Sequence, residues 1–279
     1  MPGGFSLVDD VCNATNIGVG ASADTQGYGT ILTSSGSSNA KGSWVQLVAS
    51  TVSDCAFIEI CMAYESLGGV TKMSVDIGVG AGGSEVVVLG DLWALPGFNG
   101  IMHGRIVLPF QVPAGTRIAA RCQASAASKT CAVHCVLYDG SFTQSEGIGG
   151  AEAINFTSAS TSGTTLTPSA TINTMGSYSQ LVASTAKDYY GLYGTWAFPG
   201  TRQNYLVDIA IGAGGSELVL LPQRQIYIGD TVNGIGTATD LVLLPFTPIK
   251  IPAGTRIAAR CQSSISSGNT VDIMLYGVF

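Results

Sequence analysis

Hydrophobic and polar residues alternate along the chain with the period of two that is typical of β-strands. Between Thr116 and Gln123, every second residue points to one face, and the intervening residues, two of them arginines, point to the other. Turn-forming Pro113-Ala114-Gly115 comes directly before this segment. No window of ten or more residues keeps a helical period. In the first half, the pattern predicts eight strands, near residues 30–33, 44–49, 55–63, 72–79, 84–90, 105–110, 116–123 and 131–138.

The strand pattern belongs to an internal repeat. The block from Pro113 to Gln123 recurs unchanged from Pro252 to Gln262. Three further blocks recur in the same order: residues 46–51 at 180–185, residues 75–77 and 80–85 at 207–209 and 212–217, and residues 108–110 at 244–246. The offset between copies changes slightly from block to block, which places small insertions in loops. The chain is therefore a duplicated domain.

Eight short strands joined by irregular loops predict a β-sandwich of the jelly-roll kind in each copy. The fold class is thus all-β, with two tandem duplicated β-sandwich (jelly-roll-like) domains. We place copy 1 with an N-terminal arm in residues 1–142, and copy 2 with a linker in residues 143–279. Residues 1–25 and 140–165 are rich in Gly, Ser, Ala and Thr. They fit either an arm and a linker held by neighbours or flexible surface chain.

Charge is scarce in this sequence. Charged residues make up 11% of the chain and hydrophobic residues 46%, against about 25% charged in ordinary soluble proteins. No apolar run approaches the roughly 20 residues of a membrane span, so we expect no membrane association. The pattern favours a surface that neighbouring subunits largely cover. A net charge of −6 and a pI near 4.7 argue against a nucleic-acid partner.

Features at the N-terminus and the cysteine count indicate synthesis in a reducing cytoplasm. Met1-Pro2-Gly3-Gly4 lacks the basic and apolar regions of a signal peptide. Seven cysteines, an odd number, form no small disulfide framework. Asn13 and Asn155 begin glycosylation acceptor patterns, which we interpret as chance matches without a secretion signal.

Two patterns superficially resemble ligand sites. The glycine-rich run from Gly78 to Glu85 resembles a phosphate loop, but a strand pattern follows it instead of a helix, so we expect a turn. Cys131 and Cys135 share a strand face about 13 Å apart, while His134 points to the other face. We therefore predict buried structural cysteines and no metal site, even with Cys55 and Cys61 considered.

No catalytic or cofactor-binding residues stand out. The two histidines, His103 and His134, both lie in copy 1, and no nucleophile elbow, metal-binding helix or cofactor fingerprint accompanies them. Asp9 and Asp10 form a carboxylate pair in a loop without a partner. We expect no cofactor and no enzymatic activity. Within the repeated strand, we expect Cys122 and Cys261 at equivalent buried positions.

One charged pattern is shared by both copies. Four of the seven arginines lie on the outer face of the repeated strand, and both copies retain the same two acids. These structural or interface candidates are Arg117, Arg121, Arg256, Arg260, Asp76, Asp208, Glu85 and Glu217. They fit either an intradomain network between adjacent strands or a polar contact between subunits or domains. In either case, at least one arginine per copy should pair with an acid.

The repeated blocks that end in Ser84-Glu85 and in Cys122-Gln123 resemble segments of structural proteins from tailed bacteriophages. The resemblance covers about half the chain and implies a virion component: a capsid decoration protein, or a neck, tail or fibre-base subunit. Implied partners are other copies of the chain and other virion proteins, in a particle assembled in a bacterial cytoplasm. The resemblance implies no catalytic residues.

Two other functions remain open. A carbohydrate- or receptor-binding module, which would bind a host surface glycan, should expose aromatic residues in loops. The only candidates are Trp93 and Phe98, or Tyr189, Tyr190, Tyr193 and Trp196, and these fit core or interface positions equally well. A double-sandwich major capsid protein, in which three chains build a pseudo-sixfold ring, would differ from a decoration protein in its copy number per particle.

Overall fold

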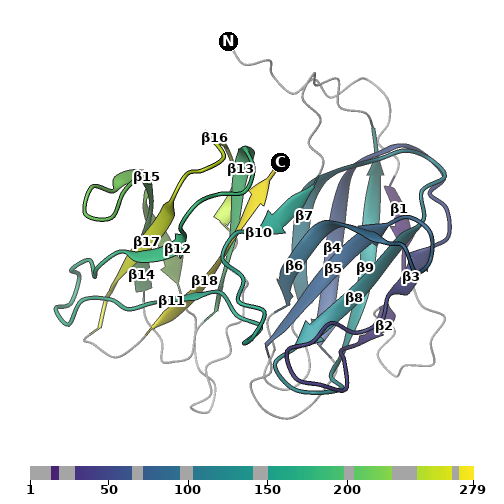
Figure 1. Ribbon diagram of the computed structural model, residues 1–279, viewed down its shortest axis with the longest axis horizontal. Helices are drawn as coiled ribbons and strands as arrows, with labels where there is room; N and C mark the ends of the chain where they lie inside the picture. The colour runs from purple at the N-terminus through teal and green to yellow at the C-terminus, as the bar shows by residue number, and fades with distance from the viewer. Residues whose placement is uncertain are drawn as a thin grey trace.

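The computed structural model describes residues 14–18, 29–64, 72–94, 103–140, 150–197, 204–227, 244–265 and 270–279. These residues form strands and loops, without a helix, and the strands build two sandwiches that lie side by side (Figure 1). The predicted all-β class and the tandem sandwiches are confirmed. The N-terminal arm, apart from residues 14–18, and the boundary expected at residue 142 lie outside the described residues.

All eight strands predicted in copy 1 are present. The first copy contains β1 (Ala14–Ile17), β2 (Thr30–Thr33), β3 (Val45–Val48), β4 (Cys55–Tyr64), β5 (Met73–Val79), β6 (Val86–Ala94), β7 (His103–Val112), β8 (Ile118–Ala124) and β9 (Thr130–Asp139). The short strand β1 was not predicted, because four residues without clear alternation carry too little signal.

Copy 2 repeats this series strand for strand. It contains β10 (Ala151–Ala153), β11 (Thr164–Leu166), β12 (Ser179–Val182), β13 (Tyr189–Ala197), β14 (Asn204–Ile211), β15 (Leu218–Tyr227), β16 (Leu244–Ile251), β17 (Ile257–Ser263) and β18 (Val271–Val278).

The pairing of the strands gives each copy the jelly-roll topology. In copy 1, one sheet has the order β2-β9-β4-β7, with β1 beside β9, and the facing sheet has the order β3-β8-β5-β6. In copy 2, the corresponding orders are β11-β18-β13-β16, with β10 beside β18, and β12-β17-β14-β15. Two antiparallel sheets of four main strands with this interleaved order are the jelly-roll arrangement.

Alternating apolar residues fill the space between the sheets. Ile118, Ala120 and Cys122 on β8 are fully buried in the core of copy 1. Ile257, Ala259 and Cys261 take the same places on β17 in copy 2. Cys122 and Cys261 are thus equivalent buried residues, as the repeat predicted.

The glycine-rich run forms a turn between β5 and β6, as expected. Gly80 and Gly83 have φ angles of 113° and 83°, which favour glycine. The Ser84 N–H donates to the Ala81 carbonyl, and the Gly83 N–H donates to the Glu85 carboxylate. The turn at residues 212–217 repeats this geometry.

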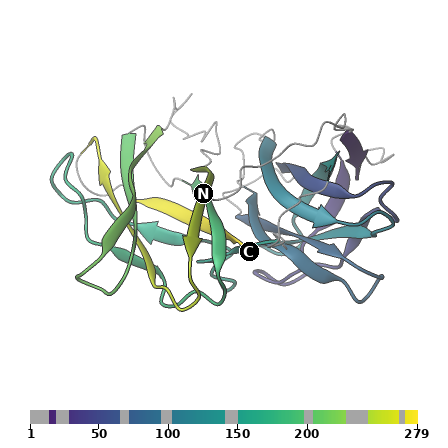
Figure 2. The ribbon, with the colours of Figure 1, turned by 90° about the horizontal axis from the view of Figure 1, so that it is seen from above.

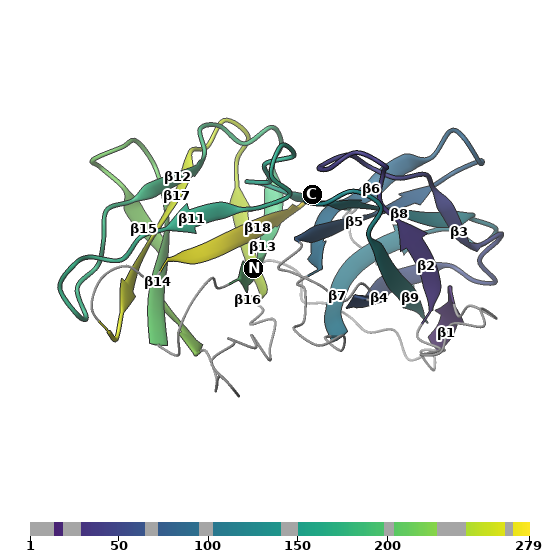
Figure 3. The same cartoon turned by 90° about the horizontal axis from the view of Figure 1, so that it is seen from below.

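Strand β10 joins the two sandwiches into a single nine-stranded sheet. It pairs antiparallel with β18 of its own copy and parallel with β6 of copy 1. In Figure 1, β10 lies between the two sandwiches, which Figures 2 and 3 show side by side from above and below. A Cβ on the neighbouring Gly150 would lie 2.2 Å from the Val88 carbonyl oxygen, so this close approach requires glycine.

The junction between the copies is also packed and hydrogen-bonded. The core of copy 1 includes Met274, Tyr276 and Val278, on the face of β18 opposite to the core of copy 2. The Tyr276 hydroxyl accepts a hydrogen bond from the backbone N–H of Trp93 at 2.7 Å. At the rim, Lys72 pairs with Asp272 at 3.0 Å. These contacts fix copy 2 against copy 1 in the described part of the chain.

The segment expected to be a linker is partly ordered structure. Residues 150–165 carry β10, most of β11 and a turn that lies on the outer face of copy 1. There Gln123 donates to the Ser158 carbonyl at 2.7 Å and to the Thr161 hydroxyl at 2.9 Å. Gln123, assigned by its alternation to the outer face, is consequently only 2% exposed. Residues 141–149 lie outside the described residues.

Candidate functional site

The structure brings all eight charged candidates together, each arginine with one acid of its own copy. Arg117, directly before β8, donates to Glu85 at 2.9 Å and to the Gly80 carbonyl at 3.0 Å, so it joins the start of the strand to the glycine turn. Its Nε also donates to the Gln46 side chain at 3.0 Å. In copy 2, Arg256 makes the same contacts with Glu217, Gly212 and Gln180 at 3.2, 2.9 and 3.1 Å.

The second arginine of each copy lies between an acid and an aromatic ring. Arg121 pairs with Asp76 on β5 at 2.8 Å, and its guanidinium lies 4.5 Å from the centre of the Trp44 ring. In copy 2, Arg260 pairs with Asp208 at 2.8 Å and lies 4.5 Å from the Tyr178 ring. The Asp76 and Asp208 side chains are 3% and 5% exposed. The arginines therefore compensate nearly desolvated charges.

Hydrogen bonds stabilise the ionised glutamates of the two networks. Burial favours the neutral form of Glu85, but its own backbone N–H, the Arg117 guanidinium and the Gly83 N–H outweigh burial and lower its pKa. The pKa of Glu217 is also lowered, first by its own backbone N–H and then, against burial, by Arg256 and Gly215. Both carboxylates are thus negatively charged at neutral pH.

One difference separates the networks of the two copies. In copy 1, Lys41 pairs with Asp76 at 2.8 Å and also with Asp91. In the alignment of the repeats, copy 2 has Met175 and Gln223 in place of Lys41 and Asp91. Asp208 therefore has Arg260 as its cation, whereas Asp76 has two cations.

These contacts identify the networks as intradomain ties between β5 and β8, or between β14 and β17. Their role in a contact between subunits stays a prediction. The aromatic partners Trp44 and Tyr178 were not predicted from the sequence. A signal was available, because Gly42-Ser43-Trp44 and Gly176-Ser177-Tyr178 end one residue before a repeated block.

Among the residues that the structure describes, no three cysteines, histidines or acids lie close enough together to hold a metal ion. Cys55, Cys122, Cys131, Cys135 and Cys261 are buried, and Cys61 is half-buried. Burial raises the pKa of Cys261 to about 12 and also raises that of Cys135, so neither is a reactive thiolate. The side chain of His103, and Asp9 and Asp10, lie outside the described residues.

The aromatic residues expected to mark a sugar-binding surface are mostly core residues. Trp93, Tyr189, Tyr193 and Trp196 are at most 3% exposed, so the alternative that they are core residues holds and they form no exposed cluster. Trp93 on β6 and Tyr193 on β13 pack into the core of copy 1, and Tyr189 and Trp196 on β13 pack into the core of copy 2. Tyr190 is half-buried, and Phe98 lies outside the described residues.

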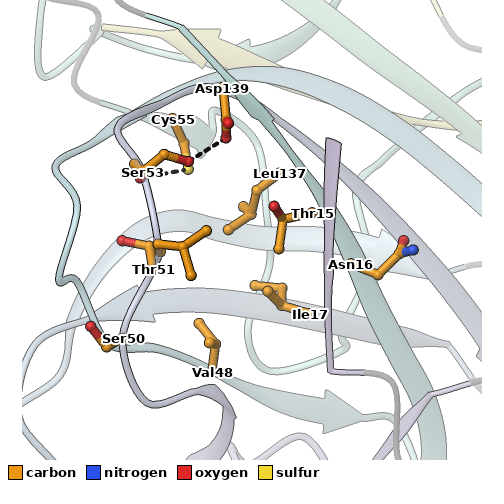
Figure 4. A pocket seen from close by; sticks show the side chains of 11 residues that line it. Thr15, Asn16, Ile17, Val48, Ser50, Thr51, Ser53, Cys55, Leu137 and Asp139 are labelled. Carbon is orange, nitrogen blue, oxygen red and sulfur yellow. Dashed lines mark hydrogen bonds between the residues drawn. The ribbon is translucent and has the colours of Figure 1, made fainter. Parts of the chain in front are cut away.

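A pocket of about 80 Å³ opens in copy 1 between β1, β9 and the chain that joins β3 to β4. Figure 4 shows its two unlike ends. Ile17, Val48 and Leu137 form an apolar end. Ser53, whose hydroxyl donates to the Asp139 carboxylate, forms with Cys55 and the Thr15 hydroxyl a polar end. Burial, followed by the Asp139 and Asp54 carboxylates, raises the pKa of Cys55 to about 11.

The chain is similar in fold to several solved structures. It resembles PNGase F, a glycosylasparaginase from Flavobacterium meningosepticum, with a TM-score of 0.43 and 9% identity over 95% of this chain and 96% of that one. It also resembles the tandem CBM22-1-CBM22-2 domain of Paenibacillus barcinonensis Xyn10C, with a TM-score of 0.25 and 9% identity over 84% and 82% of the two chains. No protein-family model and no curated protein sequence matches the chain.

These comparisons correct the expectation that the chain has no enzymatic activity. The similar solved structures include a glycosylasparaginase, which is an enzyme, so the all-β tandem architecture gives no ground for excluding catalysis. At 9% identity and a TM-score below 0.5, the similarity concerns the fold and transfers no residue role.

Proposed function

We propose that this chain is a structural subunit that associates with copies of itself in a larger protein assembly. The observation that carries the proposal is that most of the few charged side chains in the described residues are paired with one another. In the described residues, seven bases and seven acids form ion pairs with one another, largely within the fold. They leave an outer surface even poorer in unpaired charge than the 11% of the composition suggests.

Exposed apolar residues support the same proposal. Val86 at the start of β6 is 64% exposed, and Leu218 at the equivalent start of β15 is 67% exposed. Val52, Val107 and Ile172 are exposed as well. A stable interface buries about 1,200–2,000 Å² in total and is depleted of charge at its centre. Equivalent apolar positions on both copies would provide repeated contacts of this kind.

The assembly that we propose is a bacteriophage particle. The support is the resemblance of the repeated blocks to tailed-phage structural proteins, together with the jelly-roll topology, which occurs in viral capsid proteins. A decoration, neck, tail or fibre-base subunit and a major capsid protein differ in copy number. Counting the subunits in purified particles separates them.

Sedimentation velocity tests self-association directly. We expect the unmodified chain to sediment faster than a monomer as its concentration rises from about 1 to 100 µM. Val86→Asp combined with Leu218→Asp should shift it toward the monomer, because both positions would lose apolar contact area. Ser38→Asp, at an exposed polar position, is the matched control. If the double variant sediments like the unmodified chain, these positions are not in the interface.

A carbohydrate-binding module is the second candidate, and the outer face favours it. Trp44 and Tyr178 are half-buried, and each lies against an arginine and beside an exposed glutamine, Gln46 or Gln180. An aromatic face flanked by hydrogen-bonding groups suits a sugar ring. Binding to a glycan array that Trp44→Ala and Tyr178→Ala abolish would support this function, and an array without binding would contradict it.

A further inference from the structure

The outer face of copy 1 shows how this fold holds a covering segment. Gln123 donates to the Ser158 carbonyl at 2.7 Å and to the Thr161 hydroxyl at 2.9 Å. The Thr161 hydroxyl in turn donates to the Asn39 side chain at 2.8 Å. Two amide side chains on the face of one sandwich thus bind a turn that the other sandwich supplies.

Copy 2 has the same two amides on its own outer face. The repeat places Asn173 where copy 1 has Asn39, and Gln262 where it has Gln123. The backbone is also the same, because each asparagine has a φ of 56° and its N–H donates to the carbonyl of the residue after the repeated glutamine. In copy 2, however, Asn173 is exposed and Gln262 is half-buried. The same hydrogen-bonding groups are therefore more accessible there.

The surroundings of these amides are more apolar in copy 2. Three positions carry a long apolar side chain that copy 1 lacks: Ile172 for Ser38, Met175 for Lys41 and Ile265 for Ala126. Ile172 and Ile265 are 48% and 37% exposed. They lie close together, because the N–H of Asn173 donates to the Ser263 carbonyl, and the Ser263 hydroxyl is hydrogen-bonded to the backbone of Ile265. We call Ile172, Asn173, Met175, Gln262 and Ile265 the copy 2 patch.

The composition of the copy 2 patch indicates a second copy of this chain as its partner. The patch contains no charged residue, since Met175 replaces a lysine, and interface centres are depleted of charge. An amide side chain both donates and accepts hydrogen bonds, so the two amides are complementary to the same amides on another copy. The edge strand β15 carries Pro222, which opposes the addition of a strand. A further copy would therefore contact a face of copy 2 and not this edge.

We propose that two copies of this chain pair through their copy 2 patches, related by a twofold axis. In such an interface the same surface contacts itself. Ile172, Met175 and Ile265 pack against the partner, and the amides of Asn173 and Gln262 hydrogen-bond across the interface. The inference rests on the self-association proposed above and names one surface that carries it.

Hydrogen–deuterium exchange of the full chain, measured by mass spectrometry at about 1 and 100 µM, locates this surface. We expect amides in peptides that cover residues 170–176 to exchange at least about threefold more slowly at the higher concentration. Residues 36–42, the equivalent loop of copy 1, should exchange equally at both. A chain that associates without protection of residues 170–176 overturns this inference alone. A chain that is monomeric at both concentrations overturns it together with the proposed function.

Equivalent positions of the two copies provide matched variants for sedimentation velocity. Ile172→Asp places a charge in the interface and should raise the concentration of half-association at least about tenfold. Ser38→Asp adds the same charge at the equivalent position of copy 1 and should leave it unchanged. Met175→Lys reproduces the copy 1 residue and should act like Ile172→Asp, which keeps the test decisive if one variant does not fold. Equal effects of Ile172→Asp and Ser38→Asp, or no effect of Ile172→Asp and Met175→Lys, would overturn the proposal.

Discussion

At the scale of single residues, each copy has one nearly buried aspartate whose negative charge neighbouring side chains compensate, and these neighbours differ between the copies. Asp76 and Asp208 are nearly desolvated, and each depends on an arginine that a ring covers from outside. Asp76 also accepts a hydrogen bond from the backbone N–H of Asp91, and Asp208 accepts one from the backbone N–H of Gln223. Lys41 gives Asp76 a second cation, which Met175 cannot provide in copy 2. The two acids should therefore respond differently when their arginine is removed.

Arg260→Ala should destabilise the protein more than Arg121→Ala. Removing one partner of a buried ion pair costs roughly 3–5 kcal/mol. Because the arginines are partly exposed, we expect about 2–3 kcal/mol for Arg260→Ala. Arg121→Ala should cost about 1 kcal/mol less, since Lys41 still compensates Asp76. Denaturant unfolding of the two variants measures the difference. Equal losses would show that Lys41 does not compensate Asp76.

The glutamates of the network should make stability depend on acid. The folded-state pKa values of Glu85 and Glu217 lie below their ordinary value of 4.5. Their contribution to folding is therefore fully present above that value and is lost as the pH falls through the folded-state pKa. Thermal melts from neutral pH down to about pH 3 should decline less steeply for Glu85→Gln combined with Glu217→Gln than for the unmodified chain. Parallel curves would contradict this assignment.

At the scale of the strands, matched sizes keep the outer face closely packed. A Cβ on Gly78 of β5 would lie 2.7 Å from the Trp44 ring, which covers that position. In copy 2, Ala210 takes the place of Gly78 and Tyr178 takes the place of Trp44. The residue on the strand is thus larger than in copy 1, and the ring that covers it is smaller. In each copy, the size of the strand residue therefore matches the size of the ring that packs on it.

This pairing predicts a non-additive effect of two substitutions. Gly78→Ala should cost about 1–3 kcal/mol, because an added methyl group overpacks the contact with the Trp44 ring. Trp44→Tyr combined with Gly78→Ala reproduces copy 2 and should recover most of that loss. A double-mutant cycle of unfolding free energies measures the coupling. Additive effects would show that the ring and the glycine are independent.

The strands also show what could be predicted from the sequence. Alternation in β8 and β17 and the exact repeat gave the eight strands of copy 1, the duplication and the buried Cys122 and Cys261. Strands β1 and β10 were missed, because three or four residues show no usable period. The pairing of β10 with β6, some 60 residues away in the sequence, depends on tertiary packing. Local pattern also could not show that Trp93 and Tyr193 pack inside.

At the scale of the whole molecule, the shared sheet makes the tandem domains one block. Copy 2 contributes Met274, Tyr276 and Val278 to the core of copy 1, and its turn covers Gln123. The equivalent Gln262 of copy 2 is half-buried and therefore more exposed than Gln123. At the outer edge of copy 2, Pro222 takes the place of Gly90 in the aligned strand β15. A proline there opposes the addition of another strand.

Among the described residues, no helix is long and apolar enough to cross a bilayer. In the same part of the chain, seven bases and seven acids pair with one another, and Val86 and Leu218 are exposed at equivalent positions of the two copies. The central claim is that the outer surface binds further copies of the same chain.

Native mass spectrometry of the unmodified, full-length chain tests that claim most directly. The account predicts species at multiples of the 28.5 kDa chain mass, whose fraction rises with protein concentration up to about 100 µM. A single species of 28.5 kDa at every concentration, with no larger complex, would contradict it.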